Sequence, residues 1–166
     1  MTDLNVETLL DKLTENLKAE VALRQLQNPF MIGIHTGGVW IAERLHRELS
    51  ITEPLGVLDI SFYRDDFSQI GMHPQVKPSK LPPTLEERDI ILVDDVLYSG
   101  RTIRAALNEI FDYGRPKSVI LAVLIDRNGR QLPIQADCSG GHVTLASGQR
   151  VKLTGPDPLE FYIQQI

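Results

Sequence analysis

The chain has 166 residues, of which 42% are hydrophobic and 23% are charged, and its formal net charge is −5. This length suits one globular domain, and the composition excludes a disordered or a fibrous chain. The negative charge argues against a protein that holds long nucleic acid by neutralising its phosphates, although it leaves room for a local basic patch.

The first predicted element is an amphipathic helix that begins near Val6 and ends before Asn28-Pro29. Its apolar residues recur every three or four positions, and its opposite face is acidic. Because acids stand where a signal peptide carries bases, we expect the protein to reside in the cytoplasm.

Strands and helices alternate after this helix. Between residues 64 and 83 the periodicity disappears, which is typical of a functional lid, a disordered segment or a tolerated surface insertion. No apolar run approaches the roughly 20 residues that a membrane helix needs, so no membrane span is expected. The alternation predicts an α/β fold, with a mainly parallel sheet covered by helices on both faces. The predicted strands are 30–34, about 57–63, 90–93 and 118–125, and the predicted helices are about 39–49 and 102–113.

The last 40 residues differ in character, because glycines and prolines break them into short pieces. We expect a single domain over residues 1–166, with a core at about 1–125 and a small β-rich appendage at about 126–160. Cys138, the only cysteine, is expected to act as a small hydrophobe. One cysteine and four scattered histidines show no metal-ligand spacing.

One segment carries the chemistry. A hydrophobic strand ends in Asp94 and Asp95, and the chain continues as Val-Leu-Tyr-Ser-Gly-Arg-Thr into a helix that starts near Thr102. Gly100 permits close backbone approach, and the helix start points free amides at the loop. Carboxylates that accept from hydroxyl groups, next to an anion cradle, suit a sugar phosphate. Two alternatives are open: acids at a strand end also bind a metal ion alone, and Ser-Gly-x-Thr also caps a helix.

The stretch VDDVLYSGRT resembles the phosphoribosyl pyrophosphate (PRPP) signature of type I phosphoribosyltransferases. More narrowly, the chain resembles the PyrR family of pyrimidine-operon regulators and uracil phosphoribosyltransferases. The stretches that carry this resemblance are IGIHTGG, LDISFYRDD, ILVDDVLYSGRTIRAAL and GRPKSVILAVLIDRNGRQLPIQAD.

The resemblance implies a type I phosphoribosyltransferase fold in which the appendage forms a hood. It also implies transfer of ribosyl 5-phosphate from PRPP to uracil, giving UMP and pyrophosphate. Asp94 and Asp95 are the implied catalytic residues, close to a Mg²⁺ ion that is bound through PRPP and not by direct protein ligands. The general base for the uracil ring proton is left open between these aspartates and a pyrophosphate oxygen.

The implied substrate-binding residues lie in four places. These are a pyrophosphate loop, the base of a lid, the signature loop and the hood. A plain turn is the alternative for the pyrophosphate loop, and a solvated surface base is the alternative for Arg127 and for Arg130. The residues are Thr36, Gly37, Gly38, Arg64, Asp94, Asp95, Val96, Leu97, Tyr98, Ser99, Gly100, Arg101, Thr102, Arg127 and Val151.

Two departures from the family pattern affect the expected activities. Many members have Thr-Arg-Gly in the pyrophosphate loop where this chain has Thr-Gly-Gly, so a guanidinium at position 37 is missing. Members that bind messenger RNA present basic residues on and near the first helix, where this chain carries Glu15 and Glu20. Carboxylates facing phosphates oppose binding, so weak or absent RNA binding is expected.

Three functions compete at this point. The favoured one is a uracil phosphoribosyltransferase. The second is a regulator that senses UMP or PRPP with little catalysis, and the third is a phosphoribosyltransferase for a purine base. The resemblance also implies a homodimer or a higher homo-oligomer.

Overall fold

The computed structural model describes residues 5–60 and 79–166. Its centre is a five-stranded sheet in which all neighbouring strands are parallel. This confirms the predicted α/β fold with a parallel sheet. The strands follow one another across the sheet as β2 (Gly56–Leu58), β1 (Phe30–Ile34), β3 (Asp89–Leu97), β4 (Ser118–Arg127) and β5 (Cys138–Val143).

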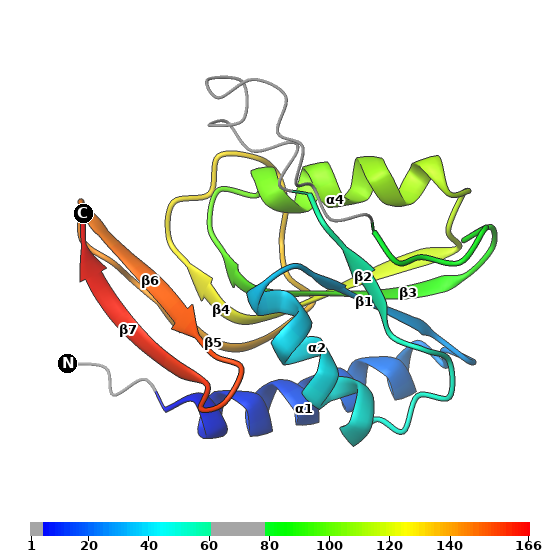
Figure 1. The fold of residues 1–166 in the computed structure, drawn as a ribbon, viewed down its shortest axis with the longest axis horizontal. Coiled ribbons are helices and arrows are strands. Elements are labelled where there is room, and N and C mark those ends of the chain that lie inside the picture. The colour runs from blue at the N-terminus through cyan, green and yellow to red at the C-terminus, as the bar shows by residue number, and fades with distance from the viewer. Residues whose placement is uncertain (1–4, 61–78) are drawn as a thin grey trace.

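Helices cover both faces of the sheet, with α1 (Val6–Leu23) and α2 (Gly37–Glu48) on one face and α4 (Arg101–Asp112) on the other (Figure 1). Successive strand residues point to opposite faces of the sheet, so each strand contributes side chains to the apolar cores on both faces. On β3, for example, Ile91 packs with α1 and α2, whereas Leu92 packs with α4. In the part of the chain that the structure describes, no helix is long and apolar enough to cross a membrane.

The main strands extend further than their apolar runs predict. The pairing of β3 with β4 continues through Asp94 and Val123 to Leu97 and Asp126. In contrast, β2 ends at Leu58, so residues 59 and 60 of the strand predicted to reach residue 63 are not part of it, and its last three residues lie outside the described residues. Residues 61–78, which include Arg64 and most of the predicted lid, lie outside the described residues.

The tail differs from the expected division at residue 125. Strand β5 lies beyond that point, yet it pairs with β4 as the fifth strand of the main sheet. The separate part is an antiparallel hairpin of β6 (Gln149–Thr154) and β7 (Glu160–Gln165), which stands beside the main sheet in Figure 1. A small apolar cluster that includes Ile125 and Val151 joins this hairpin to the sheet.

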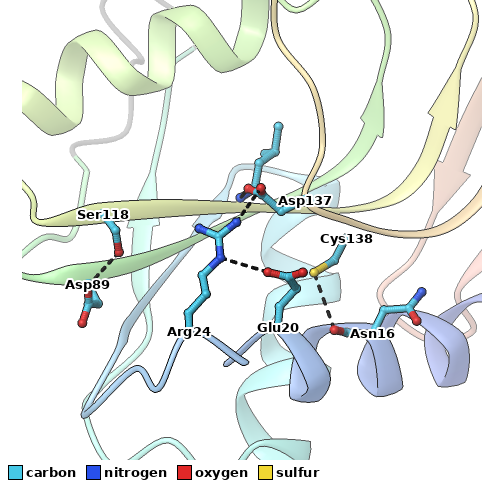
Figure 2. A network of polar contacts seen from close by, with 8 residues as sticks. Asn16, Glu20, Arg24, Asp89, Ser118, Asp137 and Cys138 are labelled. Atoms are coloured by element: carbon cyan, nitrogen blue, oxygen red, sulfur yellow. Dashed lines mark hydrogen bonds and ion pairs between the residues drawn. The ribbon is translucent and has the colours of Figure 1, made fainter. Parts of the chain in front are cut away.

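Polar contacts join α1 to the start of β5 (Figure 2). Arg24 Nε donates to Glu20 at 2.9 Å, and its Nη2 donates to Asp137 at 2.8 Å. The thiol of Cys138 lies 3.8 Å from the carbonyl oxygen of Asn16, and the residue is 3% exposed, as suits a small hydrophobe. These contacts hold α1 against the edge strand β5.

The environment of Cys138 predicts an unreactive thiol. Burial raises its pKa from 9.0 to about 12, so the thiol stays protonated at pH 8 and the nucleophilic thiolate is scarce. We expect an aromatic disulfide reagent at pH 8 to modify the native protein at least about 100-fold more slowly than the protein in denaturant. Fast modification of the native protein, with its circular dichroism unchanged, would contradict this burial.

Candidate functional site

The two acids of the signature lie at the carboxyl end of β3, the central strand of the sheet. Asp94 is 6% exposed, and its Oδ1 accepts a hydrogen bond of 2.8 Å from the amide of Asp95. Asp95 is half-buried, and its Oδ1 accepts from the amide of Val96 at 2.8 Å. Each carboxylate is therefore oriented by the backbone that follows it, at the edge where parallel sheets bind ligands.

The predicted pyrophosphate loop lies directly against these acids. A Cβ at Gly38 would lie 2.7 Å from the carbonyl oxygen of Val93 and 3.1 Å from Cα of Asp94. A Cβ at Gly37 would overlap the carboxylate of Asp95, at 2.8 Å from its Cγ. The two glycines thus let the start of α2 pack against the end of β3 without a side chain between them.

The signature loop turns from β3 into α4 through Gly100, whose φ of 95° favours glycine. The hydroxyl oxygen of Ser99 accepts from the amide of Arg101 at 3.2 Å, beside the start of the helix. Because α2 starts at Gly37 and α4 at Arg101, two helix N-termini lie at the same edge of the sheet as the acids. Their free amides and dipoles favour an anion there.

A cavity of about 670 Å³ opens beside the signature loop, between the end of the sheet and the hairpin. Four of the predicted substrate-binding residues line it, namely Val96, Tyr98, Arg127 and Val151. Its volume lies in the range of small-molecule sites, roughly 300–1,000 Å³. Sequence reasoning missed its other lining residues, which are Asn128, Gly129, Leu145, Ala146, Ser147, Gly148, Gln149, Arg150 and Ile166.

Arg127 and Tyr98 form one wall of this cavity. The guanidinium of Arg127 lies over the Tyr98 ring, 4.0 Å from its centroid, and its Nη1 donates to the carbonyl of Gln149 at 3.3 Å. Arg127 is therefore not a freely solvated surface base. Tyr98 is 48% exposed, and its ring contacts Arg127 and Gly129. The glycine at position 129 is the sequence signal that could have indicated this close packing, and in the structure its φ is 112°.

Not every predicted residue presents its side chain to the site. The side chain of Leu97 is 1% exposed and packs in the core under α4, so only its backbone is available to a ligand. Thr36 is exposed immediately before α2, and Arg64 lies outside the described residues. Among residues 5–60 and 79–166, no three His, Cys, Asp or Glu side chains form a group that could hold a metal ion.

Comparison with known sequences points to one family. The phosphoribosyl transferase domain model matches residues 4–149. A protein named "Bifunctional protein PyrR" from Nitrosococcus oceani is 61% identical over 98% of this chain and 93% of its own length. One of the same name from Pseudomonas aeruginosa is 57% identical over 93% of this chain and 91% of its own.

Solved structures agree at the level of the fold. A hypoxanthine phosphoribosyltransferase from Staphylococcus aureus superposes with a TM-score of 0.67 at 19% identity, covering 87% of this chain and 77% of that one. At this identity the likeness concerns the fold alone and does not select the base.

Proposed function

Because the chain belongs to the PyrR family of phosphoribosyl transferases, we propose that it transfers the ribosyl 5-phosphate group of PRPP to uracil, giving UMP and pyrophosphate. The observation that carries the proposal is the meeting of three parts at one edge of the sheet. These are the paired acids of β3, the glycines at the start of α2 and the N-terminus of α4. The cavity beside them supplies room for a base.

In the proposed complex, the loop 99–102 and the amides at the start of α4 bind the 5′-phosphate. Asp94 and Asp95 accept hydrogen bonds from the ribose hydroxyls. These hydrogen bonds are stronger than neutral ones because the carboxylates are charged. The amides at Gly37 and Gly38 face the departing pyrophosphate. The reaction breaks the bond from C1 of the ribose to pyrophosphate oxygen and forms a bond from C1 to uracil nitrogen, which loses its proton to Asp94, Asp95 or a pyrophosphate oxygen.

Magnesium fits this arrangement as a companion of PRPP. Carboxylate oxygens are ligands that Mg²⁺ prefers, and the ion commonly keeps several waters and substrate phosphates in its coordination sphere. Asp94 and Asp95 would hold it, indirectly, at the carboxyl end of β3. Bound Mg²⁺ supplies charge that neutralises the leaving pyrophosphate.

We assign the base to the cavity between the signature loop and the hairpin. Arg127 there offers guanidinium donors, and Val151 on β6 offers its backbone. Uracil presents carbonyl acceptors and ring N–H donors, which match such groups.

A panel of bases tests the choice of uracil. With PRPP and Mg²⁺, uracil should be consumed, whereas orotate, guanine, hypoxanthine and adenine should not. Consumption of a purine in place of uracil would assign the purine function instead.

For the regulatory activity of the family, we propose weak RNA binding by this member. Helix α1 carries four carboxylates against two lysines. Arg24, just after the helix, is paired with both Glu20 and Asp137. We expect a dissociation constant for a pyrimidine-operon leader RNA weaker than about 1 μM at physiological salt, even with UMP present. Nanomolar, UMP-dependent retention in a filter-binding assay would contradict this.

One observation favours the alternative of a sensor with little catalysis. The start of α2 lacks a guanidinium because position 37 is glycine, and an arginine there would meet the Asp95 carboxylate. A sensor would bind UMP or PRPP but release no pyrophosphate, and a coupled pyrophosphate assay distinguishes it from the enzyme.

We also propose that the protein forms at least a homodimer, and light scattering tests this.

A further inference from the structure

The segment after β4 contacts the signature loop. Arg130 donates from Nη1 to the carbonyl oxygen of Tyr98 and from Nη2 to Oδ1 of Asp126 at 2.6 Å. The register of the sheet places Asp126 opposite Leu97, at the point where β3 enters the loop. One guanidinium thus joins the loop backbone to the carboxylate at the end of the neighbouring strand.

The two residues after Arg130 contact the same loop. The amides of Gln131 and Leu132 both donate to the carbonyl oxygen of Ser99, at 2.9 and 3.1 Å. The side-chain oxygen of Gln131 accepts from Nε of Arg101 at 3.0 Å. Loop residues 98, 99 and 101 are therefore each tied to the segment 130–132.

The burial of the ion pair makes this bridge more than a surface contact. The side chains of Asp126 and Arg130 are 14% and 26% exposed, so water screens their attraction only in part. His142 also faces Asp126, with Nδ1 3.7 Å from its Oδ2, but the histidine side chain is 79% exposed. Arg130 is consequently held to its two acceptors, and its charge is already balanced by Asp126.

We propose that Arg130 is a positioning residue for the phosphate-binding loop, acting through the Tyr98 carbonyl and the Asp126 carboxylate; this inference rests on the proposed function. A loop that turns through a left-handed glycine has several accessible backbone conformations. The bridge holds the loop in one of these conformations, so the substrate does not have to order the loop on binding. Arg130 therefore affects the binding of PRPP more strongly than that of the base.

The test compares Arg130→Gln with the wild type in steady-state kinetics. We expect the KM for PRPP to rise by about 10-fold or more, because small misplacements of binding groups carry large penalties, while the KM for uracil changes by less than about 2-fold. Arg130→Lys should remain impaired, because an ammonium keeps the charge but lacks the planar fork that matches two acceptors. The matched control is Arg115→Gln, which removes an exposed arginine at the opposite edge of the sheet.

The variant Asp126→Asn distinguishes positioning of the loop by Arg130 from direct attraction of PRPP by Arg130. It also replaces Arg130→Gln as the test if that variant does not fold. If Arg130 acts through the bridge, this change also raises the KM for PRPP. If Arg130 attracts PRPP directly, removing the competing carboxylate lowers the KM, which overturns the inference. An unchanged KM for PRPP in folded Arg130→Gln overturns it as well. Absence of turnover in the wild type would instead contradict the proposed function, and the dissociation constants of UMP for the same variants, from calorimetry, then decide the role of Arg130.

Discussion

Replacing Asp95 by Asn should lower kcat/KM for PRPP by about 10- to 100-fold, with little effect on folding. A hydrogen bond to a charged group contributes about 1.5–3 kcal/mol, and the amide is a weaker acceptor for the ribose hydroxyls. Asparagine keeps an oxygen that can accept from the Val96 amide, as the carboxylate does at 2.8 Å. The midpoint of thermal unfolding should therefore move by no more than about 4 °C. Asp94→Asn should follow the same pattern, because Asn preserves its bond from the Asp95 amide.

The matched control is Asp112→Asn, the same chemical change at the exposed last residue of α4. Its kinetics should equal those of the wild type. A structural role for the paired acids would reverse the result, with lower melting temperatures and unchanged kinetics for Asp94→Asn and Asp95→Asn. That outcome would remove both residues from the proposed machinery.

The two neighbouring glycines at the start of α2, Gly37 and Gly38, should respond differently to alanine. A methyl group at Gly38 meets the backbone of Val93 and Asp94 on the central strand, which cannot yield locally. We expect Gly38→Ala to cost about 1–3 kcal/mol of stability, as overpacking typically does, and to abolish most activity. At Gly37 the obstacle is the half-buried side chain of Asp95, which can rotate. Gly37→Ala should raise the KM for PRPP by about 10-fold, with near-normal stability.

Thermal unfolding and PRPP kinetics on both variants measure this contrast, with each variant serving as the control for the other. Wild-type stability of Gly38→Ala would mean that α2 does not pack against β3 as described. Wild-type kinetics of Gly37→Ala would mean that the placement of Asp95 against this loop is unimportant for PRPP. The same geometry bears on the missing arginine, because any side chain at position 37 competes with Asp95 for space.

The sequence predicts how the centre of the candidate site is arranged, because its parts are contiguous. A buried strand, two acids, a glycine turn and a helix start follow one another between residues 90 and 102. Local chain geometry alone then brings Asp94 and Asp95 beside the N-terminus of α4. The loop at 36–38 joins them because parallel strands present their carboxyl ends at one edge.

Strand β5 was not predicted, and its glycines explain why. Gly140 and Gly141 interrupt any strand pattern, yet Gly140 is buried between two backbones. A Cβ there would lie 2.6 Å from the carbonyl oxygens of both Leu124 on β4 and Leu9 on α1. Glycine is required where a helix crosses the strand this closely. In a single sequence, however, the same residue indicates the end of a strand.

The contact of Arg127 with Tyr98 and the Arg130 bridge could not be predicted for a different reason. In the sequence, Arg127 and Arg130 are as compatible with a solvated surface position as with a site, because their spacing does not indicate which residues they contact. Their partners are set by the register of β3 against β4, which places Asp126 opposite Leu97. A register between strands some 30 residues apart is a tertiary property that local periodicity does not encode.

The central claim is that one site, formed by the β3 acids, the loop 99–102 and the hairpin cavity, holds the nucleotide product. A crystal structure of the protein with UMP tests it most directly. We expect the 5′-phosphate on the amides of 99–102, the ribose hydroxyls on Asp94 and Asp95, and the uracil ring in the cavity beside Arg127 and Val151. UMP bound elsewhere, or a uracil ring outside that cavity, would contradict it.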